Sequence, residues 1–486
     1  MDGSVGEATE KRVDRQGANG GVEVNAPSRT EHDFGGAVTV PGGALWGAQT
    51  QRAIEIFTIS ELRLPRSYLH TLGALKRAAA RTNAELGLLE PALADAIVAA
   101  ASEVADGQLD DQFPVDVFQT GSGTNTNMNA NEVIANRANQ LVGSPLGARS
   151  PVHPNDHVNL GQSSNDVTPT VIHAVAQTAL VHRLEPALHR LARELREVAA
   201  RTDTVVKTGR THLQDAVPIR LGQEFLGHAG QIERGVQRVR CARTGLAEVA
   251  LGGTAVGTGI NTHPRFAAGV LTTLAAELGI ELRETDNHFQ AQNAIDAVVF
   301  ISGALQTVAV SLLKIANDIR WMNSGPRAGL GEIEIPGLSM GSSIMPGKTN
   351  PIVAEAVCQV AAKVIGNDAT ITVAGGHGNF EITVMSPVVA HCLLESIELL
   401  AGAATVFAEH CVSGIRATHA GPAAVERGLM MATALAPRVG YDRAAEIAAT
   451  ARESGRTVRE VAREQTDLPE DELTRLLDPR RMTGSN

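Results

Sequence analysis

The clearest pattern in this sequence is a row of apolar residues at helical spacing between residues 298 and 319. They recur in alternating steps of three and four, at Val298, Ile301, Leu305, Val308, Leu312, Ile315 and Ile319. This spacing places them on one stripe of a helix of roughly 30 residues, well above the roughly 8–20 usual in globular proteins. Because so long a helix needs partners along its whole apolar stripe, the pattern predicts a helical bundle.

Two further segments support a bundle that is larger than one chain can cover. Apolar residues follow helical spacing between Leu180 and Val198, and residues 384–411 are again long, apolar and Ala/Leu-rich. We therefore expect the bundle to pack against other copies of the chain. Charged residues such as Lys314 and Asp318 interrupt the apolar stretch at 298–319, so we expect no membrane-spanning segment.

The pattern changes along the chain in a way that suggests three folded domains after a tail. Residues 1–33 lack an apolar core and a leader-like segment, and we expect a disordered tail there. The next segment, 34–162, is mixed and mostly helical. The bundle follows at 163–419, and 420–486 form a small domain of short helices rich in Arg and Glu.

Composition limits the classes of function. The net charge of −11 argues against a nucleic-acid surface or a polybasic membrane patch, so an anionic ligand must be held by local donors. The four cysteines are scattered and none forms Cys-x-x-Cys, which gives little support to a metal cluster or a disulfide framework. We expect no metal and no cofactor, and a reducing, cytoplasmic compartment as the default.

The stretch "GSSIMPGKTNP", residues 341–351, resembles a nucleotide-binding P-loop at first sight. That motif needs four residues between its glycines, but five separate Gly341 from Gly347. It also needs a β-strand before the first glycine, where this chain has the Pro- and Gly-containing "EIPGLSM". We reject an ATP site. A loop of about 25 residues between two helical segments is more typical of an active-site lid.

Four polar clusters stand out in a chain otherwise rich in Ala and Leu. They are "TGSGTNTNMNANE" (120–132), "HPNDHVNLGQSSNDVTPT" (153–170), "GRTHLQDAVP" (209–218) and the loop around Lys348. Each is expected to precede a helix, where free backbone N–H groups favour an anion. Singly they could be helix caps, and "GGTAVGTG" (252–259) is interpreted as tight packing. Together they predict a site for a small carboxylate.

These blocks resemble the class II fumarases of the fumarase/aspartase superfamily, in order and in spacing. The matching blocks are "GSSIMPGKTNP", "TGSGTNTNMNANEV", "VHPNDHVNLGQSSNDV", "GRTHLQDAVPIRLGQE", "GGTAVGTGIN" and "SGPRAGLGEI". The similarity extends from about Phe34 to the C-terminus. It implies a mainly α fold of three domains, whose central bundles pack together in a homotetramer so that each active site draws on three chains.

The resemblance also implies a function, with roles for particular residues. It implies reversible anti addition of water to fumarate, giving L-malate through an aci-carboxylate intermediate, as in the tricarboxylic acid cycle. Ser342 would be the base on C3, His212 would handle the water or hydroxyl, and Glu355 would orient His212. The implied substrate-binding residues are Ser122, Gly123, Thr124, Ser163, Ser164, Asn165, Thr211, Ser343, Lys348 and Asn350.

Two alternatives remain open, and the chain departs from the family in two places. An aspartase would typically have Ser-Thr-Asn-Asp at 163–166 and Ala at Gly253, so this sequence favours the fumarase; a non-catalytic structural relative is more remote. "PGLSM" (336–340) replaces an acidic stretch before the catalytic loop. Arg149 lies one position from the family's arginine, which bears on a secondary anion site implied at His153, Pro154, Asn155 and Asp156.

Overall fold

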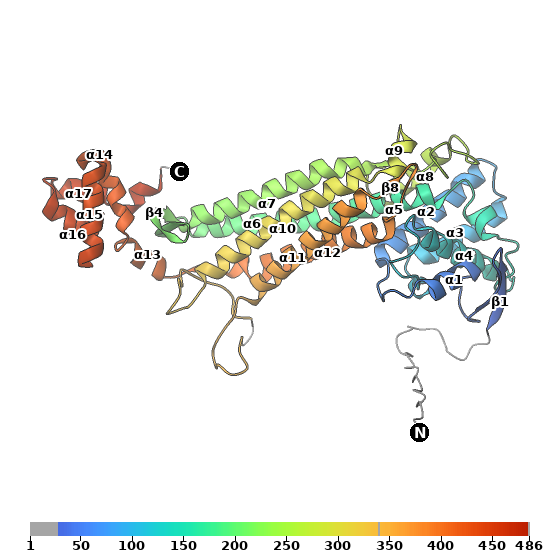
Figure 1. The fold of residues 1–486 in the computed structure, drawn as a ribbon, viewed down its shortest axis with the longest axis horizontal. Helices are drawn as coiled ribbons and strands as arrows, with labels where there is room; N and C mark the ends of the chain where they lie inside the picture. The colour runs from blue at the N-terminus through green and yellow to red at the C-terminus, as the bar shows by residue number, and fades with distance from the viewer. Residues whose placement is uncertain (1–27, 339–340, 485–486) are drawn as a thin grey trace, which may run out of the picture. The chain divides into compact units, whose positions relative to one another are not determined.

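The computed structural model describes residues 28–338 and 341–484. The chain is mainly helical, as predicted, and its strands pair in two-stranded sheets (Figure 1). Its contacts divide it into two compact units, Met1–Gln119 with Asn125–Leu160, and Thr120–Thr124 with Gly161–Asn486. The three-domain division from the sequence stays a prediction.

The first unit opens with a β-hairpin in which β1 (Arg29–Asp33) pairs antiparallel with β2 (Gly36–Val40). The Arg29 guanidinium donates hydrogen bonds to four backbone carbonyls in the segment after β2, which fixes the first strand. The prediction that residues 29–33 belong to a disordered tail is therefore wrong, because contacts distant in sequence hold them. Residues 1–27 of that predicted tail lie outside the described residues.

Helices make up the rest of the first unit. They are α1 (Ala48–Ile56), α2 (Arg66–Glu85), α3 (Pro91–Ala105), α4 (Thr124–Leu141) and the short turns η1 (Asp110–Gln112) and η2 (Pro154–Val158). Helix α3 begins where its sequence dictates: the Glu90 carboxylate accepts hydrogen bonds from the N–H groups of Ala92 and Leu93, and Pro91 occupies the first position, where no N–H is needed. Its apolar face packs on α2.

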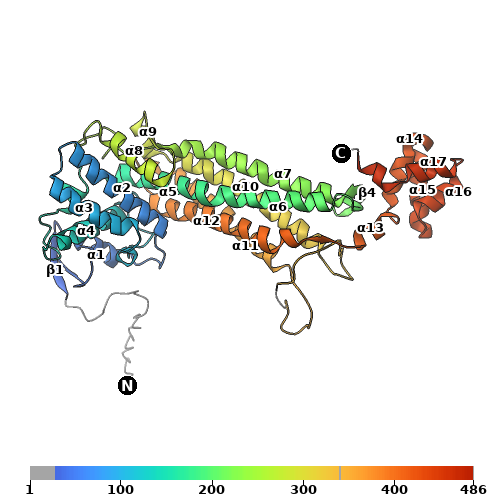
Figure 2. The same ribbon diagram turned by 180° about the vertical axis from the view of Figure 1, so that it is seen from behind.

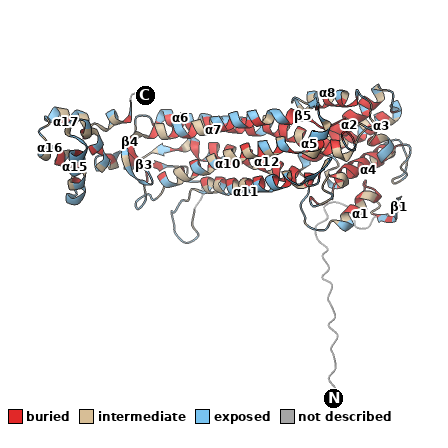
Figure 3. Cartoon of the chain, turned by 45° about the horizontal axis from the view of Figure 1, so that its top comes forward, coloured by how far each residue is buried: buried red, intermediate tan, exposed pale blue. Residues whose placement is uncertain are grey.

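The second unit is built on a bundle of long helices. These are α5 (Ser164–Ala179), η3 (Leu180–Leu184), α6 (Glu185–Arg201), α7 (Leu221–Arg243), α10 (Asp296–Met322), α11 (Ile352–Gly375) and α12 (Ser386–His410). Helix α10 packs against α7 and α11, while α12 packs against α11 and α6 (Figures 1 and 2). All seven apolar residues of the stripe at 298–319 are buried. The predicted long helix and its bundle are confirmed, and Figure 3 shows buried residues along these helices.

Two bundle segments, Asp296–Met322 and Ser386–Gly414, are long and apolar enough to cross a membrane by length and composition alone. Core helices of globular proteins also meet that test. About half of each apolar window is buried inside this chain (44% and 56%), against the neighbouring bundle helices. Their apolar character is that of bundle helices.

Short elements connect the long helices. The hairpin β3 (Val206–Thr211) and β4 (Gln214–Arg220) lies between α6 and α7. The others are η4 (Thr244–Ala247), β5 (Glu248–Val249), α8 (Phe266–Leu278), β6 (Arg283–Glu284), α9 (His288–Asn293), β7 (Ile333–Glu334), β8 (Gly378–Asn379), β9 (Ile382–Thr383), η5 (Val412–Gly414) and β10 (Arg416–Ala417). Strand β7 pairs with β10, so the segment before the loop 341–350 is tied to the end of the bundle.

The C-terminal part of the chain folds around an apolar core of its own. Its elements are α13 (Ala420–Val425), η6 (Leu429–Leu435), α14 (Ala436–Val439), α15 (Tyr441–Ser454), α16 (Val458–Gln465), α17 (Glu470–Leu476) and η7 (Pro479–Thr483). The core includes Leu435, Ile447 and Val461. Helix α16 begins with a capping box between Thr457 and Glu460, as its sequence T-x-x-E indicates.

Candidate active site

Five of the predicted substrate-binding residues meet at the N-terminus of α5. The Ser122 and Thr124 hydroxyls lie 2.8 Å apart, and the Thr124 hydroxyl is 2.8 Å from that of Ser164. Ser163 caps the helix, and its Oγ accepts a hydrogen bond from the Asn165 N–H. These side chains are half-buried, so they form a connected set of neutral donors beside a helix N-terminus, which is suited to a carboxylate.

Gly123, the sixth residue of this group, lies in the turn that enters α4. Its φ of +76° falls in the left-handed region, and a Cβ there would come within 2.9 Å of the Thr168 side chain. Only glycine therefore fits this turn without strain. The neighbouring Asn165 donates its amide Nδ2 to the Ala255 carbonyl at 2.7 Å. The glycine-rich block at 252–259, which the sequence reading assigned to packing, thus borders the donor cluster.

His212 lies on an exposed, strained turn. It and Leu213 form the two-residue loop between β3 and β4, with φ values of 55° and 60°. Such hairpin loops normally contain Asn-Gly, because both central residues must adopt positive φ. A histidine and a leucine in this conformation cost free energy that the surrounding structure must offset. Thr211, the last residue of β3, is also exposed.

A buried network of four charges lies beneath this hairpin. The Lys207 ammonium is 2.9 Å from the Glu224 carboxylate and 2.8 Å from that of Glu332, and Arg210 pairs with Glu332 at 2.9 Å. Lys207 and Glu332 are each about 2% exposed. Burial is the largest effect on Glu224 and raises the pKa of its carboxyl, although Lys207 opposes this. The network joins β3, α7 and the segment that leads to the loop 341–350.

Beside the network lies a cavity of about 790 Å³, lined among others by Arg210, His212, His228 and Trp321. His228 is almost fully buried, and burial lowers the pKa of its imidazole to about 4. Sequence reasoning missed this histidine and Lys207. Lysine and histidine are usually at least partly exposed, so their residue types do not predict burial. The residues around them in the sequence do not indicate it either.

The loop 341–350 closes on itself. The Ser342 Oγ accepts hydrogen bonds from the backbone N–H groups of Ile344 (3.2 Å) and Met345 (2.8 Å). The Lys348 ammonium donates to the Asn350 Oδ1 at 2.7 Å, and the Asn350 Nδ2 donates to the Gly341 carbonyl at 2.7 Å. The loop surface is largely exposed, including Ser343 and Lys348. Lys348 and Asn350 are thus paired, and Asn350 binds the carbonyl of the residue that precedes Ser342.

One chain does not bring all the predicted residues together. The donor cluster lies at the N-terminus of α5, whereas the His212 hairpin lies at the opposite end of the bundle (Figure 1). Glu355 is in the first turn of α11, and in the described part of the chain no hydrogen bond or ion pair joins it to His212. Nor do residues 28–338 and 341–484 contain three clustered His, Cys, Asp or Glu side chains that could hold a metal ion.

The secondary anion site has a different environment from the one expected. His153 caps the turn η2, and its own Nδ1 accepts the N–H groups of Asn155 (3.3 Å) and Asp156 (3.1 Å), which an anion would otherwise use. Burial is the largest effect on His153 and lowers the pKa of its imidazole. The Arg149 guanidinium is bound to the His32 carbonyl at 3.2 Å.

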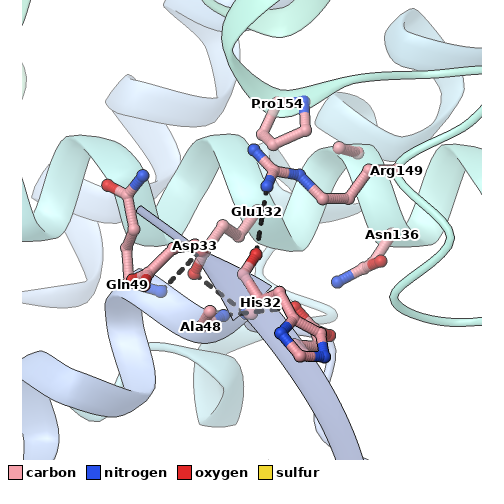
Figure 4. Close-up of a pocket in the computed structure, with 11 residues that line it drawn as sticks. His32, Asp33, Ala48, Gln49, Glu132, Asn136, Arg149 and Pro154 are labelled. Carbon is pink, nitrogen blue, oxygen red and sulfur yellow. Dashed lines mark hydrogen bonds between the residues drawn. The ribbon is translucent and has the colours of Figure 1, made fainter. Parts of the chain in front are cut away.

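Carboxylates dominate the small pocket that Pro154 borders (Figure 4). Glu31, Asp33 and Glu132 all line it, with Arg149 as the cation beside them. The Arg52 guanidinium holds the pKa of Asp33 below its usual value, whereas burial raises that of Glu132. Three acidic side chains would repel a dianion, so this pocket does not support an anion site beside Pro154.

Comparison with known proteins agrees with the motifs. A family model described as lyase matches residues 36–366, and one described as fumarase C C-terminus matches residues 431–484. The chain is 55% identical to a fumarate hydratase class II of Halobacterium salinarum, over 94% of this chain and 97% of the relative. It is 51% identical to a fumarate hydratase class II 2 of Bradyrhizobium diazoefficiens, with the same coverage.

The fold agrees as well. A crystal structure of the recombinant class II fumarase from Schistosoma mansoni superimposes with a TM-score of 0.91 at 36% identity, over 94% of this chain and 99% of that one. The chain therefore belongs to the lyase family. Within it, the chain is a member of the class II fumarases, as the sequence motifs predicted. These relatives do not favour the aspartase alternative.

Proposed function

We propose that this chain is a hydro-lyase that catalyses the reversible anti addition of water to fumarate, giving L-malate. The difficult step in the malate direction is removal of a proton from the carbon beside a carboxylate, because the product is a doubly charged aci-carboxylate. Hydrogen-bond donors that are already in place for that charge are worth about 2.7–4 kcal/mol each. Lys348 and Asn350, joined at 2.7 Å, are the donors we assign to it.

The environment of Ser342 is the observation that carries this proposal. Its Oγ accepts two backbone N–H groups, from Ile344 and Met345. Two such donors stabilise negative charge on the oxygen, which a serine needs if it is to act as a base. The deprotonated Oγ takes the proton from C3, and the electron pair of that bond moves into the carboxylate to give the aci-carboxylate. That pair then returns to form the double bond between C2 and C3 as the C2–O bond breaks, and the hydroxyl leaves as water with a proton from His212.

The other carboxylate of the substrate is assigned to the donor cluster at α5. Ser122, Thr124, Ser163, Ser164 and Asn165 supply hydroxyl and amide donors at the N-terminus of α5, where the helix dipole favours a negative charge. Gly123 shapes the turn, while Thr211 and Ser343 accompany His212 and Ser342. No residue of this set requires a metal or a cofactor for its role.

A complete site requires more than one copy of the chain. His212 and the donor cluster lie at opposite ends of one bundle (Figure 1). Helix α6, which lies between α5 and β3 in the chain, is alone about 25 Å long, so one chain cannot hold a small dicarboxylate at both ends. We propose a homotetramer in which three chains contribute to each site and in which Glu355 can orient His212. The long apolar bundle helices supply surface for such packing. A cytoplasmic location and a role in the tricarboxylic acid cycle remain part of this proposal.

A direct assay tests the function. Purified protein should raise ultraviolet absorbance from L-malate as the conjugated double bond forms, without added metal, and should release no ammonia from L-aspartate. Ammonia release with malate inert would identify an aspartase. Inactivity on both substrates would favour a non-catalytic relative.

Two substitutions test the assigned acid–base groups. Ser342→Ala and His212→Asn should each lower kcat at least about 100-fold, the usual scale for such groups. The matched controls are Ser454→Ala and His410→Asn, which change exposed residues outside the site and should leave kcat unchanged. Near-normal turnover in either test variant would remove that residue from the mechanism.

A further inference from the structure

Asp166 connects the donor cluster to the glycine-rich block at 252–259. It is the third residue of α5 and is fully buried. Its Oδ1 accepts the Ser163 N–H at 2.9 Å, and its Oδ2 accepts the N–H groups of Gly252 (3.1 Å) and Thr254 (2.9 Å). A single carboxylate therefore ties the start of α5 to the loop Gly252–Ala255.

The loop Gly252–Ala255 has a conformation that its sequence does not favour. Thr254 has φ = 53°, a region that β-branched residues rarely adopt, and Gly252 has φ = 102°. Contacts from outside the loop must hold it there. Asp166 provides one such contact. The buried Gln292 provides another, because its Nε2 donates a hydrogen bond to the Thr254 carbonyl at 2.8 Å.

The same loop sets the orientation of a predicted substrate-binding side chain. The Ala255 carbonyl accepts the Asn165 Nδ2 at 2.7 Å, so one amide N–H is directed at the loop and the plane of the amide follows the position of Ala255. A shift of the loop would therefore turn the Asn165 amide away from its place beside Ser164.

Gly253 allows the loop to lie this close to Gln292. A Cβ added at Gly253 would be 2.0 Å from the Gln292 Oε1 and 3.0 Å from the His288 Nδ1. Because Gln292 is only 2% exposed, its side chain has little room to move aside. A larger residue at position 253 must therefore displace either the loop or the Gln292 amide that binds the Thr254 carbonyl.

We infer that Asp166 is a positioning residue: it holds the loop Gly252–Ala255, and the loop holds the Asn165 amide where a substrate carboxylate binds. Gly253 contributes because its lack of a side chain lets the loop pack against Gln292. This inference rests on the proposed function, because Asn165 is assigned to the substrate there. Asp166 itself touches no substrate. Its effect on catalysis passes through Asn165.

The decisive variant is Gly253→Ala in the full-length protein, because it disturbs the contact between the loop and Gln292 without removing a buried charge. It should lower kcat/KM for fumarate and L-malate about 10- to 100-fold, as expected when a binding group is misplaced by about 1 Å. Asp166→Asn should change kcat/KM in the same direction, because an amide turns its NH₂ toward N–H donors. Gly43→Ala is the matched control, since a Cβ there meets nothing within 4 Å.

A double-mutant cycle separates positioning from a structural role. If the loop acts through Asn165, Gly253→Ala should have little further effect on kcat/KM in an Asn165→Ala background. Full additivity of the two changes, or kcat/KM of Gly253→Ala within twofold of the wild type, would overturn the inference. Should Asp166→Asn fail to fold, Gly253→Ala decides alone. A wild-type protein inactive on both substrates would instead refute the proposed function.

Discussion

Replacing Lys207 by methionine tests the buried charge network beneath the His212 hairpin. The substitution keeps the length of the side chain but removes the ammonium, which lies 2.9 Å from Glu224 and 2.8 Å from Glu332. Glu332, about 2% exposed, is then left with Arg210 as its remaining cationic partner at 2.9 Å. Glu224 is about 23% exposed, so water can solvate part of its carboxylate. Most of the loss in stability therefore comes from the buried carboxylate of Glu332.

The magnitude follows from this geometry. Breaking a buried ion pair by removing one partner costs about 3–5 kcal/mol, because an uncompensated charge remains in a poorly solvated place. The entropy of unfolding of a 486-residue chain is about 1 kcal/mol/K near 60 °C. We therefore expect Lys207→Met to lower Tm by about 3–5 °C. Turnover should fall about tenfold or more, since His212 follows Lys207 closely on the same hairpin.

Calorimetry and malate turnover, measured on the same preparations, provide the assay. The control is Lys207→Met combined with Glu332→Met, because an apolar pair of similar volume often matches or exceeds the stability of a buried ion pair. The double variant should recover most of the lost Tm. A shift below about 1 °C in Lys207→Met, or additive losses in the double variant, would refute the reasoning that the two charges are coupled.

Two further predictions concern a buried histidine and a helix cap. Burial lowers the pKa of His228 to about 4, so below about pH 6.5 the unfolded chain binds a proton that the folded chain does not. The free energy of unfolding is therefore unaffected by His228 above pH 6.5 and falls by roughly 3 kcal/mol as the pH drops toward 4. His228→Gln should flatten that part of the Tm–pH curve. Parallel curves for the variant and the wild type would contradict this. Glu132 accepts the N–H groups of Gly47, Gln49 and Thr50 and so caps α1. Glu132→Gln should cost about 1–3 kcal/mol and speed hydrogen exchange in α1; unchanged exchange would show that the cap contributes little.

The bundle was predictable because its cause is local in sequence. An apolar stripe such as that from Val298 to Ile319 specifies a buried helix face whatever its partner is, and every residue of the stripe is buried. Strand β1 was not predictable in the same way. It is held by Arg29, whose four carbonyl partners lie after β2, and nothing in the residues around Arg29 indicates those contacts.

The candidate site was predictable in its members but not in their arrangement. The polar blocks identify Ser122, Thr124 and Ser164, and the structure joins them in one hydrogen-bonded set. No sequence pattern reveals that Lys207 is buried, because a lysine on a strand is usually exposed. The hairpin loop at His212–Leu213 was not predictable either, because it lacks the glycine or asparagine that its backbone conformation favours.

Two positions where local preference and structure disagree share a physical arrangement. His212 and Thr254 both adopt positive φ, and each belongs to an element that buried charges hold. Lys207 and its partners support the first, and the Asp166 carboxylate supports the second. A strained backbone persists only when surrounding contacts over-determine it, so these charges compensate for conformations that the local sequence would not choose. Removing these charges should consequently shift His212 and Asn165 and lower turnover. It should not unfold the bundle, because the apolar stripes of the long helices supply most of its stability.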